Sequence, residues 1–111
     1  MPIPNLSIKI IRFLSDTYKN KTYIYGNLGI YIRIHFSVLN ENSNIQDIFD
    51  VVKNINANIL NKFHKAIKTE ENLDQFSLKI RSSILTIICQ EVNIPKNEIK
   101  KFLEHYKTNS N

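Results

Sequence analysis

Residues 21–39 have the sequence KTYIYGNLGIYIRIHFSVL, and this stretch decides the fold that we predict for the chain. Both halves are dense in tyrosine, isoleucine, threonine, phenylalanine and valine, the residue types that are most common in strands. Between them, residues 26–29 (GNLG) hold the chain's two glycines, which is a turn signal. We therefore predict an antiparallel β-hairpin with strands at residues 21–25 and 30–39.

The second strand alternates aliphatic and polar residues, as expected for a sheet with one buried and one solvated face. A hairpin loop with an odd number of residues keeps one face uniformly apolar, so that register is favoured. It places five side chains on the polar face: Tyr23, Tyr25, Tyr31, Arg33 and His35. Tyrosines beside cations would form a stacking platform for nucleic-acid bases. Two alternatives stay open: the tyrosines serve only as good strand formers, or a helix covers this face.

The remaining sequence predicts helices on both sides of the hairpin. Residues 5–18 fit a helix, although the alternation of Leu6, Ile8 and Ile10 leaves a strand as the alternative. A capping signal at residues 43–46 opens a long helix over 45–67, and two further helices follow at 72–92 and 96–106. The expected class is α+β: an N-terminal helix, an antiparallel β-hairpin, and three helices with the long one packed on the sheet.

Length and composition indicate one domain over residues 1–111 with a flexible tail at 107–111, since 111 residues at 42% hydrophobic content support a single core. The formal net charge of +5 favours a polyanionic partner. The abundance of isoleucine, asparagine and lysine indicates an AT-rich genome, which explains part of the lysine excess. The distribution of charge is more informative, because residues 1–35 and 76–111 are basic and residues 36–75 are acidic.

Residues 88–102 resemble the helix-turn-helix pattern of DNA-binding proteins. A small residue, a left-handed residue, an apolar residue and two apolar anchors occupy the expected places: Cys89, Asn93, Ile94, Ile99 and Phe102. The resemblance implies that residues 96–106 form a recognition helix, which would present Lys96, Lys100 and Lys101 to the nucleic-acid backbone.

Catalytic signatures are missing from the sequence. Cys89 lies alone in an apolar run, and the three histidines lack the spacing of metal ligands. We expect no enzyme activity, no cofactor, no metal, no small-molecule substrate and no membrane association, in a cytoplasmic protein.

The predicted function is that of a small basic protein that associates with RNA or DNA. The predicted contacts are Tyr23, Tyr25, Tyr31, Arg33, Lys96, Lys100 and Lys101. The alternative is an assembly subunit that forms homo-oligomers or binds a protein partner. It would use the apolar stripe of residues 45–67 and the free edge of the sheet.

Overall fold

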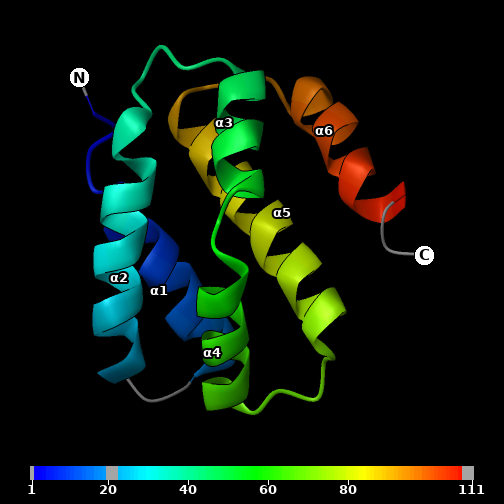
Figure 1. The fold of residues 1–111 in the computed structure, drawn as a ribbon. Coiled ribbons are helices and arrows are strands. Elements are labelled where there is room, and N and C mark those ends of the chain that lie inside the picture. Colours follow the sequence, from blue (N-terminus) through cyan, green and yellow to red (C-terminus); the bar gives the residue numbers. More distant parts are fainter. Residues whose placement is uncertain (1, 20–22, 109–111) are drawn as a thin grey trace.

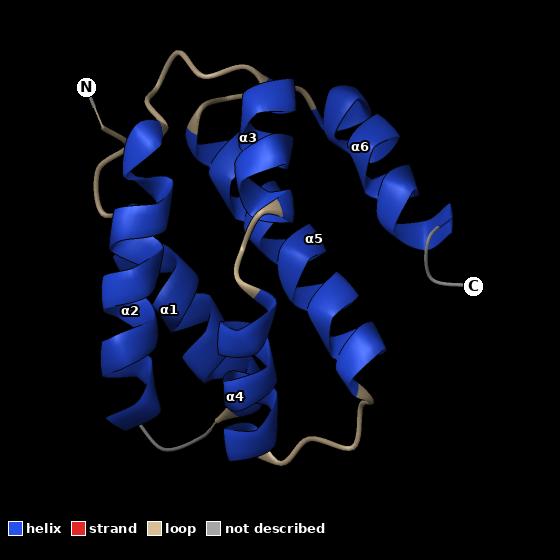
Figure 2. Ribbon diagram, in the orientation of Figure 1, coloured by secondary structure: helices blue, strands red, loops and turns tan. Residues whose placement is uncertain are grey.

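The computed structural model describes residues 2–19 and 23–108, without the side chains of residues 23–24 and 107–108. Within these ranges the protein is a bundle of α-helices with one short 3-10 helix, as Figures 1 and 2 show. The α-helices are α1 (Leu6–Tyr18), α2 (Tyr23–His35), α3 (Ile45–Lys53), α4 (Ala57–Ile67), α5 (Leu73–Glu91) and α6 (Lys96–Thr108). The predicted α+β class is therefore wrong: in the described residues, strand pairing is limited to one isolated bridge between Pro2 and Asn40.

The predicted hairpin is instead the helix α2, which continues into the 3-10 helix η1 (Phe36–Val38). The apolar residues of this stretch also recur with a helical period near 3.6. The side chains that follow this period are the ones buried in the structure: Tyr25, Leu28, Ile32 and Phe36. Residues 26–29 lie inside α2 and form no hairpin turn, and neither glycine has a positive φ. Residues 21–22 of the predicted first strand lie outside the described residues. Burial of the stripe outweighs the β-propensity of the isoleucines and the cost of about 1 kcal/mol for each helical glycine.

The predicted long helix over 45–67 is also wrong, because the chain turns at residues 54–56 and forms α3 and α4 instead. The Asn56 side chain caps α4 by accepting hydrogen bonds from the backbone N–H groups of Asn58 (2.8 Å) and Ile59 (3.3 Å). The apolar stripe that was expected to pack on a sheet or to form a dimer surface lies in the protein's own core: Ile48, Val52, Ile55, Leu60, Phe63 and Ile67.

Arg81 of α5 stabilises the turn between α3 and α4. Its guanidinium donates hydrogen bonds to the carbonyls of Val52 (2.7 Å), Lys53 (2.9 Å) and Ile55 (2.9 Å), at the end of α3 and in the connection that follows. The last carbonyls of a helix have no donor from a following helical turn, and Arg81 supplies a charged donor here, in addition to the Ile55 N–H that donates to the Val52 carbonyl at 3.2 Å. One side chain, distant in sequence, therefore holds the turn that separates α3 from α4.

The other predicted helices are confirmed. Residues 6–18 form α1, so the helix was the correct alternative there. Asn72 caps α5 by accepting a hydrogen bond from the Gln75 N–H (2.9 Å). Pro95 precedes α6, which extends into the predicted tail as far as Thr108, and residues 109–111 lie outside the described residues.

Helix α5 is the centre of the bundle and contacts α1, α3, α4 and α6 (Figure 1). Its inward residues are almost completely buried: Phe76, Ile80, Ile84, Leu85, Ile88 and Cys89. On one side of the molecule α1 and α2 pack together, and on the other side α6 runs back alongside α5 (Figure 1). Among the described helices, none combines the length and the apolar character that crossing a membrane would require.

Candidate interaction surface

The outer side of α1 and α2 carries the large apolar side chains that the fold leaves in solvent. Among the described residues these are Ile8 on α1, Ile30 and Ile34 on α2, and Val38 on η1, which are between 53% and 70% exposed. Residues four apart on a helix lie on the same side, so Ile30, Ile34 and Val38 form one line, which we call the apolar ridge. A cluster of large exposed aliphatic side chains on one side of a small protein is typical of a binding surface.

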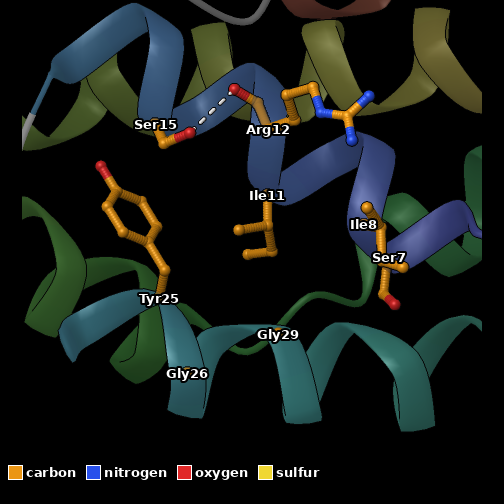
Figure 3. Close-up of a pocket in the computed structure, with 8 residues that line it drawn as sticks. All are labelled: Ser7, Ile8, Ile11, Arg12, Ser15, Tyr25, Gly26 and Gly29. Carbon is orange, nitrogen blue, oxygen red and sulfur yellow. Dashed lines mark hydrogen bonds between the residues drawn. The ribbon is translucent and has the colours of Figure 1, made fainter. Parts of the chain in front are cut away.

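A groove of about 470 Å³ lies between α1 and α2 (Figure 3), and it is lined by the exposed Ile8 and by Gly26, four residues before Ile30. Ile11 points from α1 toward Gly29 of α2, where an added Cβ would lie 3.6 Å from the Ile11 Cγ1 atom. At Gly26 an added Cβ would meet nothing within 4 Å. A Cβ at position 29 would therefore make ordinary contact with Ile11, whereas position 26 borders the open part of the groove.

Charged residues line the two hollows near the ridge. Arg12 lines the groove from α1, and its guanidinium points toward Ile8 and away from Gly26 (Figure 3). A second hollow, of about 540 Å³, joins Val38 at the far end to Asp47 and Asp50 of α3. Neither Arg12 nor Asp47 takes part in a salt bridge between described residues. Acidic residues therefore lie beside the Val38 end of the ridge, and the exposed Arg33 lies next to Ile34 at its middle.

The predicted stacking platform is wrong because its sheet does not exist. Tyr25 is buried, and its ring packs edge-on against Phe63 at 5.6 Å. The half-buried Tyr31 stacks on His35 at 5.2 Å, and its hydroxyl oxygen accepts a hydrogen bond from the Asn56 N–H at 2.8 Å. Arg33 is exposed, whereas the side chain of Tyr23 lies outside the described residues.

The turn between α5 and α6 has the predicted local geometry. Asn93 has a φ of 60°, and the N–H of Ile94 donates to the Cys89 carbonyl at 3.0 Å, as in a Schellman helix terminus. Lys96, Lys100 and Lys101 are exposed on α6. They lie on a different element from Arg33, and the contact of these lysines with nucleic acid stays a prediction.

The histidine and cysteine side chains considered as catalytic or metal-binding candidates have structural roles. The His35 Nε2–H donates to the Val51 carbonyl (2.7 Å) and the His64 Nε2–H to the Glu71 carbonyl (2.6 Å). Burial raises the pKa of the Cys89 thiol to about 12, with a smaller contribution from the charge of Glu98. In the described part of the chain, no three His, Cys, Asp or Glu side chains gather into a group that could hold a metal ion.

Tyr106 on α6 supplies a prediction about pH. Its hydroxyl is buried without a hydrogen-bond partner among the described residues, and burial raises its pKa to about 12. The unfolded tyrosine ionises near pH 10, so the stability that comes from keeping this hydroxyl neutral is complete below about pH 10 and is lost toward pH 12. We expect Tyr106→Phe to keep or raise the unfolding free energy at pH 7, by up to about 1 kcal/mol, and to flatten its alkaline decline.

Urea titrations at pH 7 and between pH 9 and 12 measure both effects. The matched control is Tyr18→Phe, because the Tyr18 hydroxyl donates to the Glu71 carboxylate at 3.4 Å and its loss should lower stability at pH 7. A Tyr106→Phe variant that is clearly less stable than the natural protein at pH 7 contradicts the prediction.

Sequence reasoning missed the α1–α2 face. The strand interpretation placed Ile30 and Ile34 on the core side of a sheet, and Ile8 lay off the apolar stripe of the first helix. The sequence holds a signal for this face: Ile30, Ile34 and Val38 are spaced by four residues. Leu28, Ile32 and Phe36 have the same spacing, so the stretch can form a helix with one apolar line buried and a second one exposed.

Comparisons of the chain with models of protein families, with curated proteins and with solved structures found no match.

Proposed function

We propose that this protein is a non-catalytic interaction module that binds a polypeptide through the outer face of α1 and α2. The observation that carries the proposal is the apolar ridge beside an open groove. Exposed aliphatic side chains of this size cost free energy in water, about 25 cal/mol for each Å² that a partner would cover. A groove beside them supplies the concave shape into which a partner's side chains fit.

The proposal keeps the assembly function that the sequence offered as its alternative, but moves it to another surface. The stripe of residues 45–67 is buried inside the bundle, so it is not the interface that we propose. The absence of catalysis in the proposal is supported by Cys89, whose buried thiol has a raised pKa and is a poor nucleophile at neutral pH. A cytoplasmic location stays part of the proposal, consistent with a reduced cysteine.

Site-specific photo-cross-linking in cells that produce the protein tests this function. A photoreactive amino acid at position 34, which is 65% exposed on the ridge, should yield a covalent adduct of defined mass with another polypeptide. The matched control places the same amino acid at position 62, an exposed position on α4. Position 34 giving no adduct, or the two positions giving the same adducts, would contradict the proposal.

Nucleic-acid association is a second candidate function, favoured by α6. Lys96, Lys100 and Lys101 are all exposed there, and none forms a salt bridge within the described residues. Lysine binds phosphates as a point charge, so this surface would hold the backbone of RNA or DNA without reading its sequence.

A filter-binding titration with a mixed-sequence RNA and DNA tests this second function. Retention at low salt should fall steeply as salt rises, because binding releases counterions from the phosphates. Changing Lys96, Lys100 and Lys101 to glutamine should abolish retention, whereas changing Lys62 and Lys65 of α4 should not. No retention of the natural protein at low salt would exclude this function.

A further inference from the structure

Helix α6 lies at one edge of the bundle and packs mainly on α3 and α5 (Figure 1). Four of its side chains are buried or half-buried: Ile99, Phe102, Leu103 and Tyr106. The ring of Phe49 on α3 lies 5.2 Å from that of Phe102 and 5.6 Å from that of Tyr106. The attachment of α6 to the bundle therefore depends on a short apolar stripe.

The largest side chain of this stripe carries a group that opposes docking. The Tyr106 hydroxyl is buried, and it has no hydrogen-bond partner among the described residues. In water this hydroxyl would be hydrogen-bonded, so docking of α6 takes a polar group out of water without replacing its partner. Docking of α6 is therefore weaker than its apolar contacts alone would make it. Segments with weak attachments open locally, at a lower cost than unfolding the whole chain.

Cys89 of α5 lies under α6. Its side chain shares one side of α5 with Leu85 and Arg81, because these positions are spaced by four residues. Burial raises the pKa of the Cys89 thiol, and the charge of Glu98 on α6 adds to this effect. An electrostatic interaction also links Cys89 to Tyr106 at the other end of the α6 stripe. The thiol is 0% exposed while α6 is docked.

The connection from α5 to α6 is a suitable hinge. Asn93 has a φ of 60°, and Pro95 cannot donate a backbone hydrogen bond, so neither residue continues α5 as a helix. A few loop residues between two helices suffice to absorb the backbone rotation of a hinge motion.

We infer that α6 is a latch, which leaves α3 and α5 as one unit by rotation about residues 93–95 while α1 to α5 stay folded, and that this opening exposes Cys89. The latch therefore controls access to the single thiol of the chain. The inference is independent of the proposed function, because it uses neither the apolar ridge nor the groove between α1 and α2.

Thiol labelling of the full chain under native conditions measures this opening. The Cys89 thiolate attacks an aromatic disulfide reagent, forms a mixed disulfide with one half of it and releases the other half as a coloured thiolate. When the latch closes faster than the thiol reacts, the labelling rate is proportional to the population of the open form. We expect labelling at least about 10-fold faster than global unfolding, measured by urea titration, would allow.

Two substitutions of the same kind separate local opening from global unfolding. Ile99→Val shortens a buried side chain of α6 and should speed labelling about 5-fold. Ile67→Val makes the same change at a buried position of α4, so it lowers global stability but should leave the labelling rate unchanged. Equal acceleration by the two variants would show that Cys89 reacts only after global unfolding. No acceleration by Ile99→Val would show that another segment covers the thiol, and either result overturns the inference.

Removing the Tyr106 hydroxyl tests the latch in the opposite direction. Tyr106→Phe should slow labelling by up to about 5-fold, because docking then buries no unpartnered hydroxyl. The matched control is Tyr18→Phe on α1, which should leave the labelling rate unchanged. In hydrogen exchange, the N–H groups of residues 100–106 should exchange together and faster than those of residues 80–90 in α5. Faster labelling of Tyr106→Phe, or equal protection of α6 and α5, contradicts the latch.

Discussion

Replacing Phe76 by alanine is expected to lower the free energy of unfolding by about 4 kcal/mol. Phe76 is 0% exposed at the centre of the bundle. Its ring lies 5.6 Å from that of Tyr18 on α1 and 5.7 Å from that of Phe63 on α4, with the His64 ring at 5.0 Å. The substitution leaves a cavity where three helices meet, so both the transfer energy and the packing contacts of the ring are lost.

The loss is large compared with the 5 to 15 kcal/mol that typically stabilise a domain, and it corresponds to a fall in Tm of roughly 15 °C. Thermal and urea unfolding followed by circular dichroism measure it. The control is Phe102→Ala on α6, where the ring is half-buried and the expected loss is about 1 to 2 kcal/mol. Equal losses at the two positions would show that Phe76 is not the centre of the core.

Replacing Arg81 by methionine is expected to cost about 3 kcal/mol, although methionine keeps most of the side-chain volume. Three carbonyls lose a charged donor at once, those of Val52, Lys53 and Ile55. Hydrogen bonds from charged groups are stronger than neutral ones, and a partly buried carbonyl without a partner is unfavourable. Burial lowers the pKa of Arg81 from its ordinary value, which is the desolvation that these three contacts offset.

Two controls separate the geometry of Arg81 from its charge. Arg81→Lys keeps the charge but not the planar fork, so it should recover only part of the stability. Lys79→Met removes an exposed cation that pairs with Glu71 at 3.4 Å, and should cost less than about 1 kcal/mol.

Hydrogen exchange locates the effect of Arg81→Met. The backbone N–H groups of Asn54 and Ile55, which are hydrogen-bonded within the turn after α3, should exchange faster than those of α5. A uniform increase over the whole chain would contradict a local role for Arg81.

A helix was predictable from the sequence where the spacing of apolar residues and the residues that cap or end a helix indicate the same element. Asn72 and Pro95 mark the starts of α5 and α6, and Asn93 adopts the left-handed conformation expected at a helix end. These signals act within a few residues and need no distant partner. Most of the apolar stripe predicted within residues 45–67 is buried, although the single helix was wrong and Ala66 of the stripe is exposed.

The break between α3 and α4 was not predictable, because its main support is distant in sequence. Asparagine at positions 54 and 56 is compatible with a helix interior as well as with a turn, at a cost of a few tenths of a kcal/mol. The donor that satisfies the end of α3 is Arg81, at least 26 residues further along the chain.

By itself, the sequence determined where most helices begin and end and, outside residues 23–38, most of the side chains that avoid water, because both depend on local periodicity and capping. Only the tertiary structure decided between strand and helix for residues 23–35, which satisfy both periods. In the folded protein Ile11 of α1 packs over Gly29, and the stripe from Tyr25 to Phe36 is buried. That packing selects the period of 3.6 and turns Ile30, Ile34 and Val38 outward, so the candidate interaction surface is a product of tertiary contacts.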